Sequence, residues 1–371
     1  MPSSEPPFID CVIIGVNAAA TLARCLDSVL QSHYPADRLQ LYYVDGGSTD
    51  DSLTIAGQYS QVRVIALQPR YPTPGLGRNA GWRQGCAPLV QFLDSDTILH
   101  PDWLARASAA MQDGIGAVWG RRQELHPEAT VFNYIADLEW NGPPGESEAF
   151  GGDVLIRREA LERTGGYDED LVGGEDPELS QRVRQLGYKI IHLDVPMTRH
   201  DIAMTRLSQY WRRAYRTGYG FAAVTHRHRR AAAGFWAREI IRVAIRGGGS
   251  LGLMVLGLVG SWWTPWWLLS WLPAAGLLFY PRLRSVPRLA AEKQISLDKA
   301  RLYAWHCSLV VIPEFFGAVR YGLGALTGRP LRNRPRRLQT GRTEGAEKRE
   351  QGKGKREAGS GHPPGPQPER S

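Results

Sequence analysis

Short apolar runs alternate with amphipathic segments through the first half of the chain. The runs are rich in β-branched residues, and each is long enough for one buried strand: residues 9–14, 39–44, 62–67 and 90–93. Between the first two runs, apolar residues recur on one helical face: Leu22, Leu26, Val29 and Leu30. Strands that alternate with helices of this length are typical of parallel pairing. The sequence therefore predicts an α/β fold with a doubly wound sheet.

The second half has a different pattern, in which arginines flank long apolar segments. Residues 205–230 and 235–246 each predict a helix with one apolar face and one arginine-rich face, and the second carries Arg238, Arg242 and Arg246 at four-residue spacing. Such helices suit an anionic membrane surface. Packing against the first half of the chain explains the pattern of residues 205–230 equally well.

Residues 247–281 contain no charged side chain. The Trp-Pro cluster at 262–267 marks a break, because Trp prefers the membrane interface and Pro interrupts helices. Arginines flank both ends of the segment, which places both ends in the cytoplasm. We expect a helical hairpin here, transmembrane or re-entrant, and a marginal span or interfacial helix at residues 303–326.

These patterns divide the chain into four parts. They are an α/β domain (1–203), amphipathic interfacial helices (204–246), transmembrane or re-entrant helices (247–327) and a basic tail (328–371) whose composition predicts disorder from residue 344 onward. The first ten residues lack the basic and apolar regions of a signal peptide. We therefore expect the α/β domain to face the cytoplasm at the cytoplasmic (inner) membrane.

The formal net charge of +8 belongs mainly to the second half. A nucleic-acid-binding module interleaves basic residues with exposed aromatics on a compact domain. Here the basic residues flank apolar helices instead, which favours membrane lipids as partners. No nucleic acid is expected as a partner.

The fourth apolar run ends in two carboxylates one residue apart, Asp94 and Asp96. In an open α/β sheet, ligands bind beyond the carboxyl ends of the strands. Carboxylates at that place suit Mg²⁺, which proteins hold through one or two carboxylates and substrate phosphate oxygens. Taken alone, the pair is explained as well by an Asp-rich turn.

Two further loops carry polar residues at strand ends. Asp45 follows the second apolar run and is expected to accept hydrogen bonds from a ligand hydroxyl, while the glycines after it allow close approach of the backbone. Residues 75–81 open a helix whose N-terminus, together with Arg78, favours a phosphate. The first loop thus indicates a ligand with a hydroxyl group, and the second indicates a ligand with a phosphate.

Six motifs occur in the order typical of family 2 glycosyltransferases, which the segment from Phe8 to Arg230 resembles. They are Asp45-Gly46-Gly47-Ser48-Thr49-Asp50, Gly77-Arg78-Asn79-Ala80-Gly81, Phe92-Leu93-Asp94-Ser95-Asp96, Phe150-Gly151-Gly152, Gly165-Gly166-Tyr167-Asp168 and Gly173-Gly174-Glu175-Asp176. The resemblance implies a GT-A fold, a nucleotide diphospho-sugar donor and inversion at the anomeric carbon. A UDP-sugar is the favoured donor.

The resemblance also implies roles for single residues on the donor side. Asp45 resembles the acid that contacts the uridine, Arg78 and Asn79 resemble the donor-side polar pair, and Asp94 resembles the residue near the ribose and sugar. The remaining residues expected to bind the donor are Gly15, Asn17, Ser95, Gly151 and Gly152.

The metal and catalytic residues follow from the same resemblance. Asp96 resembles the metal ligand, and His200, beyond an expected strand at 188–193, resembles the histidine that completes the metal site. The cofactor is then Mg²⁺ or Mn²⁺, which acts as a Lewis acid on the diphosphate. In the Glu175-Asp176 pair, Asp176 resembles the general base that takes the proton of the acceptor hydroxyl.

The chain departs from the family pattern at two places. Residues 15–18 lack the aromatic and acidic residues that contact the donor base in many members. Processive members carry Gln-x-x-Arg-Trp, and here Gln209 and Arg212 are kept but Arg213 replaces the tryptophan. This favours transfer of one sugar per encounter, with Gln209, Trp211 and Arg212 expected to contact the acceptor.

The sequence thus predicts a membrane-attached inverting glycosyltransferase that acts on a lipid-linked or cell-surface glycan. A polyprenyl-phosphate sugar synthase and a processive polysaccharide synthase remain the alternatives among enzymes. An inactive donor-binding membrane scaffold is the alternative from a different class. Intact Asp94, Asp96 and Asp176 argue against the scaffold.

Overall fold

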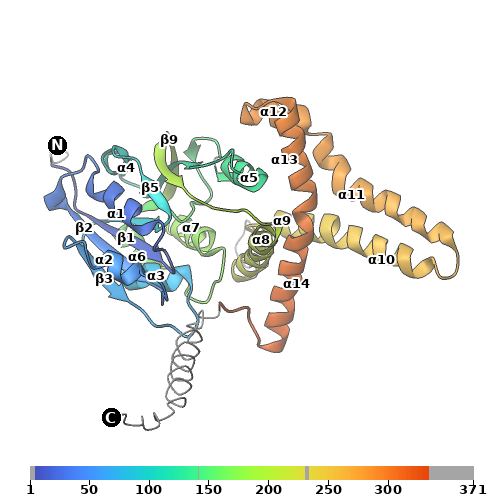
Figure 1. Cartoon of the computed structure of the whole chain (residues 1–371), viewed down its shortest axis with the longest axis horizontal. Helices are drawn as coiled ribbons and strands as arrows, with labels where there is room; N and C mark the ends of the chain where they lie inside the picture. The colour runs from blue at the N-terminus through green and yellow to red at the C-terminus, as the bar shows by residue number, and fades with distance from the viewer. Residues whose placement is uncertain (1–4, 141, 230–233, 334–371) are drawn as a thin grey trace, which may run out of the picture. The chain divides into compact units, whose positions relative to one another are not determined.

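The computed structural model describes residues 5–140, 142–229 and 234–333. The first half of the chain is built on a nine-stranded sheet with the order β3-β2-β1-β4-β8-β6-β9-β5, and β7 pairs with β9 (Figure 1). The strands are β1 (Ile9–Gly15), β2 (Leu39–Asp45), β3 (Val62–Ala66), β4 (Leu89–Asp94), β5 (Thr97–Leu99), β6 (Ile115–Glu124), β7 (Gly145–Glu146), β8 (Val154–Arg157) and β9 (Lys189–His200).

The predicted parallel pairing is confirmed for the first four strands and recurs between β6 and β9, while the other pairs described here are antiparallel. β1 pairs in parallel with β2 and β4, and β2 pairs in parallel with β3. β8 is antiparallel to both β4 and β6, and β5 is antiparallel to β9, so the sheet is mixed. The short strands β5, β7 and β8 carry too few residues to show a period in the sequence.

Helices α1 to α7 pack against this sheet. They are α1 (Leu22–Leu30), α2 (Ser52–Ala56), α3 (Pro74–Trp82), α4 (Trp103–Ala110), α5 (Val131–Trp140), α6 (Arg158–Thr164) and α7 (Glu175–Gln185). The predicted apolar face of α1 is confirmed, because Leu22, Leu26 and Val29 are buried and Leu30 is half-buried. These side chains join the core formed by β1, β2 and β4.

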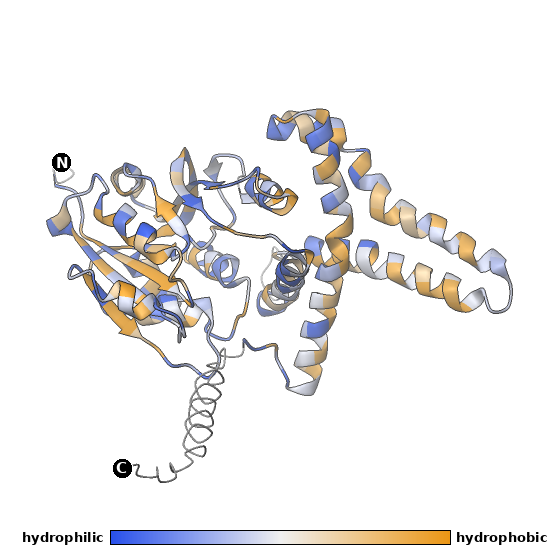
Figure 2. Cartoon of the chain, in the orientation of Figure 1, coloured by the Kyte–Doolittle hydropathy of each residue, from blue (hydrophilic) through white to orange (hydrophobic). Residues whose placement is uncertain are grey.

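The second half is helical and contains the predicted hairpin. Its elements are α8 (Leu207–Arg227), α9 (Ala237–Arg242), a π-helical turn (Val243–Gly249), α10 (Ser250–Gly260), a 3₁₀ turn (Pro265–Ser270), α11 (Trp271–Leu283), α12 (Val286–Lys293), α13 (Leu297–Leu309) and α14 (Val311–Thr327). Helices α10 and α11 pack against each other and reverse direction at the Trp-Pro cluster (Figures 1 and 2). Two helices, Ala237–Gly260 and Leu297–Thr327, are long and apolar enough to cross a membrane. The predicted part boundary at residue 246 therefore falls inside a continuous helix.

Two arginines of the first of these helices, Arg242 and Arg246, do not face outward as the amphipathic pattern suggested, whereas Arg238 is exposed. Arg242 pairs with Glu314 of α14 at 3.0 Å, and Arg246 donates to the carbonyls of Leu277 and Leu278 at 3.2 and 2.7 Å. Ile241 and Ile245 are instead 57% and 56% exposed. Apolar side chains therefore lie on the outer side of this helix, and Arg242 and Arg246 tie it to neighbouring helices.

Helix α8 crosses α14 at very close range. A Cβ on Gly218 would collide with the backbone of Glu314, and a Cβ on Gly317 would collide with the backbone of Tyr215. Glycine at both positions lets the two backbones touch. The amphipathic pattern of α8 had two explanations, a membrane surface and packing within the protein. The contact with α14 shows that packing within the protein explains a large part of the pattern.

The predicted basic tail begins at residue 328, and only residues 328–333 of it belong to the described part of the chain. The expected disorder at 344–371 lies outside the described residues.

Candidate active site

Asp94, Asp96 and His200 form a cluster at the ends of β4 and β9. One ligand atom from each lies within 4.8 Å of the others, and His200 Nε2 is 3.2 Å from an Asp96 carboxylate oxygen. β5 pairs with the end of β9, which brings Thr97 opposite His200 and so sets Asp96 beside the imidazole. The sequence predicted Asp96 and His200 as metal ligands, and the structure brings them together with Asp94.

The donor set of this cluster fits a hard divalent cation. It offers two carboxylates and one imidazole, and the Asp94 and Asp96 side chains keep 30% and 40% of their surface exposed. The Nδ1 atom of His200 is buried and has no hydrogen-bond partner among the described residues. Oxygen ligands with one imidazole suit Mg²⁺ or Mn²⁺. The residues present therefore fit the cofactor that the sequence predicted.

Protonation of His200 competes with metal binding at this cluster. Burial opposes protonation of His200, but the hydrogen bond to Asp96 and its negative charge raise the pKa of the imidazole overall. Only the neutral imidazole binds a metal ion. Metal affinity is therefore expected to fall as the pH drops through the pKa of His200.

Arg78 of α3 holds three carboxylates together below the cluster. Its guanidinium lies 2.9 Å from Asp94, 3.1 Å from Glu175 and 3.2 Å from Asp176. The side chain is 2% exposed and also packs over the ring of Tyr167. The two terminal nitrogens of Arg78 are directed at these carboxylates, and its contact with a donor phosphate stays a prediction. Arg78 thereby links the predicted metal site to the predicted catalytic pair.

Asp176 lies at the start of α7, as the sequence predicted. Its side chain is 15% exposed, and Glu175 beside it is 9% exposed. Burial raises the pKa of the Asp176 carboxyl to about 8, although the nearby Arg78 opposes the shift. A carboxyl whose pKa is near the working pH is suited to accept a proton during a reaction.

Asp45 and Asn79 both form hydrogen bonds within the protein, and their contact with a donor stays a prediction. The Asp45 carboxylate accepts hydrogen bonds from the backbone N–H groups of Gly47 and Ser48 at 2.9 and 2.8 Å, and from the hydroxyl groups of Tyr43 and Ser48. The Asn79 amide is likewise fully used. It donates to Tyr167 O and Glu169 at 2.9 and 2.8 Å, and accepts from Trp82 and the Tyr167 N–H at 2.9 Å each. Both side chains shape loops near the site.

The remaining predicted donor-side residues lie around the same strand ends. Asn17, with a φ of 55°, accepts from the Thr49 N–H at 2.8 Å and so ties the loop after β1 to the loop after β2. A Cβ on Gly15 would lie 2.5 Å from the Ser95 hydroxyl, and one on Gly152 would lie 2.6 Å from an Asp94 oxygen. A Cβ on the neighbouring Gly151 would lie 2.9 Å from Arg122. The glycines thus permit close packing around Asp94, while their contact with a donor stays a prediction.

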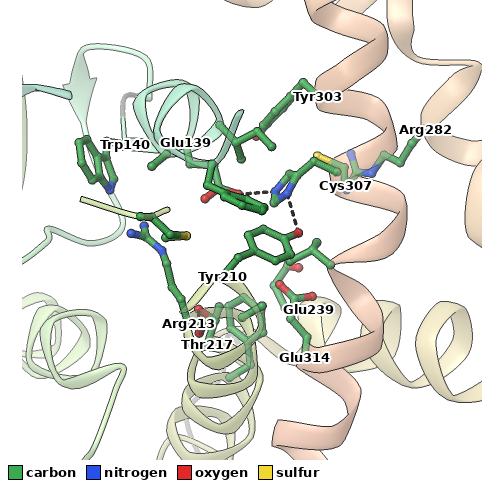
Figure 3. Close-up of a pocket in the computed structure, with 18 of the residues that line it drawn as sticks. Glu139, Trp140, Tyr210, Arg213, Thr217, Glu239, Arg282, Tyr303, Cys307 and Glu314 are labelled. Atoms are coloured by element: carbon green, nitrogen blue, oxygen red, sulfur yellow. Dashed lines mark hydrogen bonds and ion pairs between the residues drawn. The ribbon is translucent and has the colours of Figure 1, made fainter. Parts of the chain in front are cut away.

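A cavity of about 600 Å³ opens beside this cluster, between α5 and α8 on one side and α11, α13 and α14 on the other (Figure 3). Its wall includes Trp140, whose ring lies 4.9 Å from that of His200. The sequence did not predict this cavity. The sequence feature that could have indicated a cavity is the presence of polar residues, such as His306, within an apolar segment.

The predicted acceptor residues Gln209, Trp211 and Arg212 do not line this cavity. Tyr210, Arg213, Ala214 and Thr217 of the same helix do. Gln209 instead accepts from the backbone N–H groups of Thr205 and Arg206 at 2.9 and 2.8 Å, which caps α8. Trp211 packs near Phe316 of α14. Their contact with an acceptor stays a prediction.

Comparison with known proteins identifies relatives of both halves of the chain. The model of glycosyl transferase family 2 matches residues 10–162, and the model of glycosyl transferase family group 2 matches residues 89–280. The glycosyltransferase AglE of Haloferax volcanii is 26% identical over 197 residues, which are 51% of this chain and 65% of that protein. An N-acetylglucosaminyltransferase of Mesorhizobium japonicum is 35% identical over 150 residues, which are 38% of this chain and 34% of that protein. The chain thus spans less than two thirds of the length of these relatives.

A solved structure supports the fold. The mannosyltransferase PcManGT from Pyrobaculum calidifontis, in complex with GDP-Man and Mn²⁺, superposes with a TM-score of 0.58 at 18% identity, covering 86% of this chain and 88% of that one. The prediction of a GT-A fold followed by a helical region is confirmed.

Proposed function

We propose, because the chain belongs to glycosyl transferase family 2, that it transfers a sugar with inversion from a nucleotide diphospho-sugar to a hydroxyl of a lipid-linked or cell-surface glycan. A UDP-sugar is the favoured donor. One observation supports this proposal above all: Arg78 forms ion pairs with both Asp94 of the Asp94–Asp96–His200 cluster and Asp176. In this proposal a cation site and a proton acceptor are linked through one guanidinium group, which supports a concerted role for them.

The residues of the chain divide the work of the reaction. Asp94, Asp96 and His200 would hold Mg²⁺ or Mn²⁺, which supplies Lewis-acid neutralisation of the departing diphosphate. Asp176 accepts the proton of the acceptor hydroxyl as that oxygen attacks the anomeric carbon. Arg78 orients Asp176 and Asp94 through ion pairs that are shielded from water. Glu175 shares the charge of Arg78 and so limits how strongly the guanidinium stabilises ionised Asp176.

Thermal-shift measurements with UDP and GDP, each with Mn²⁺ or with EDTA, test the proposal. A ligand that binds only the folded protein stabilises it by about 2.7 kcal/mol at 100 times its dissociation constant. We expect one nucleotide to raise the melting temperature with Mn²⁺ and neither to do so with EDTA. An equal shift with EDTA, or none with either nucleotide, contradicts the proposal.

The helical half is proposed to attach the chain to the membrane as a hairpin. Trp262, Trp263 and Trp266 at its tip are 85%, 76% and 74% exposed. The limbs are a helix of 24 residues (Ala237–Gly260), about 36 Å long, and the 3₁₀ turn with α11 (residues 265–283), about 32 Å long. Both lengths are close to the thickness of the hydrocarbon core, about 30 Å. The site then faces the cytoplasm together with both ends of the hairpin.

Reporter fusions test this topology. We expect the chain to remain in the membrane pellet after alkaline carbonate, and a fusion after Arg288 to report a cytoplasmic location, because positive residues favour that side. A fusion before Ala237 serves as the matched cytoplasmic control. An external location after Arg288 would show one crossing in place of the hairpin.

A further inference from the structure

The cavity beside the candidate active site joins the two halves of the chain. α5 and α8 supply Glu139, Trp140, Tyr210 and Arg213, while α11 and α13 supply other lining residues (Figure 3), among them Arg282, Tyr303, His306 and Cys307. At one end Trp140 lies against His200 of the proposed metal site. The helices on the other side belong to the part of the chain with exposed apolar faces. A molecule in this cavity therefore lies between the proposed reaction centre and the proposed membrane helices.

The carboxylates of the cavity are already paired. Glu139 lies 2.7 Å from His306 Nε2, and His306 Nδ1 lies 2.8 Å from the Tyr210 hydroxyl. Glu239 and Glu314 both pair with Arg242, at 2.6 and 3.0 Å. These contacts leave little unused negative charge for a cationic ligand.

Two arginines of the cavity have no such partner. Among the described residues, neither Arg213 nor Arg282 makes a hydrogen bond or ion pair through its side chain. Arg213 is only packed over the ring of Trp140, at 5.9 Å from the ring centroid. In the view of Figure 3 the Arg213 side chain points toward Trp140 on one side of the Glu139–His306 pair, and Arg282 lies beside Cys307 on the other side. They supply positive potential from two walls of a partly closed space.

A half-buried cation without a hydrogen bond or ion pair is costly, and that cost indicates what kind of ligand would pair with it. Burial lowers the pKa of Arg213, and the charge of Glu139 only partly offsets this. An anion in the cavity would offset the desolvation of the guanidinium, and phosphate oxygens match its donor geometry. The rest of the lining includes aromatic and aliphatic side chains such as Phe132, Ile135 and Phe221, which suit an apolar chain.

We propose that this cavity binds the phosphate-bearing head of a lipid acceptor, with Arg213 and Arg282 as its anion-binding residues. The proposal rests on the proposed function and narrows its acceptor to a phosphate-linked lipid. The phosphate lies between Arg213 and Arg282, and the apolar chain lies along the aromatic and aliphatic part of the lining.

Equilibrium binding to the full chain in neutral-lipid nanodiscs tests this inference. Farnesyl phosphate is the probe, farnesol carries the same chain without the charge, and inorganic phosphate carries the charge without the chain. We expect farnesyl phosphate to bind at least about tenfold more tightly than either. Arg213→Gln and Arg282→Gln should each weaken its binding about tenfold, as for loss of one charge-assisted contact. Arg284→Gln, at an exposed position two residues from Arg282, is the matched control and should bind as the wild type does.

The other outcomes contradict the inference in distinguishable ways. Equal binding of farnesol shows that the phosphate is not recognised, and unchanged affinity in both variants places the phosphate elsewhere. Displacement of farnesyl phosphate by an equal concentration of phosphatidylglycerol shows a site for bulk anionic lipid in place of an acceptor site. A wild-type chain that binds nucleotide with Mn²⁺ but not farnesyl phosphate contradicts the cavity's role alone. A chain that binds neither contradicts the proposed function as well.

Discussion

Replacement of Asp176 by Asn is expected to lower turnover by about 10² to 10⁴-fold, the range for loss of a general base. The amide keeps the size of the side chain but cannot take a proton from the acceptor hydroxyl. Donor binding should be unchanged, since Asp94, Asp96 and His200 remain in place and Arg78 keeps its pairs with Asp94 and Glu175. Initial rates at saturating donor, together with nucleotide binding, measure the two effects separately.

The pH profile gives a second measurement of the same role. A protonated carboxyl cannot act as a base, so turnover should rise with pH through the pKa of Asp176, which burial raises to about 8. A divalent cation bound at Asp94 and Asp96 would lower the pKa of Asp176, so the rise in turnover should lie at or below about pH 8. Asp176→Asn should lose this rise.

Asp170→Asn is the matched control, because Asp170 lies exposed in the loop that precedes α7. It should retain the wild-type rate and pH profile. Near-wild-type turnover in Asp176→Asn would place the base on another residue.

The strands and motifs that form the candidate site could be predicted because their signals are local. Each of β1 to β4 is an apolar run that ends in a polar loop, and parallel pairing brings those ends to one edge of the sheet. The residue pair Asp94 and Asp96 lies at such an end, and Asp176 lies at a helix start marked by Pro177. Neither conclusion needed knowledge of distant contacts.

Residue roles that depend on distant partners could not be predicted in this way. Arg78 is 97 residues from Glu175 in the sequence, and nothing local shows that these carboxylates use its donors. Asn79 bonds to Tyr167 and Glu169, about 90 residues away. A polar residue at a helix start suits a ligand or an internal partner equally well, and only the tertiary structure decides between them.

The helical half shows the same limit. The four-residue spacing of Arg242 and Arg246 correctly placed them on one helical face but did not say which way that face points. Arg242 finds Glu314 on α14, and Arg246 finds carbonyl groups of α11. The charged face of a helix usually meets water, but the ion pair between Arg242 and Glu314 turns this face toward the neighbouring helix instead. The cavity was missed for the same reason, since its walls come from segments more than 160 residues apart, such as Glu139 and His306.

Replacement of Asp96 by Ala is expected to weaken Mn²⁺-dependent nucleotide binding by about 100-fold or more, beyond the range for loss of an outer-shell group. A diphosphate and a carboxylate repel each other, so Asp96 can contribute to donor binding only through a shared cation. The Asp96 side chain is 40% exposed and forms an ion pair with His200, so its removal leaves no buried carboxylate unpaired and the fold should be retained. Titration of UDP and GDP with Mn²⁺ and with EDTA measures the effect, and Asp113→Ala, at an exposed position outside the site, is the control. Unchanged nucleotide affinity in Asp96→Ala would show that the Asp94–Asp96–His200 cluster does not hold the donor, and the proposed function would lose the observation that carries it.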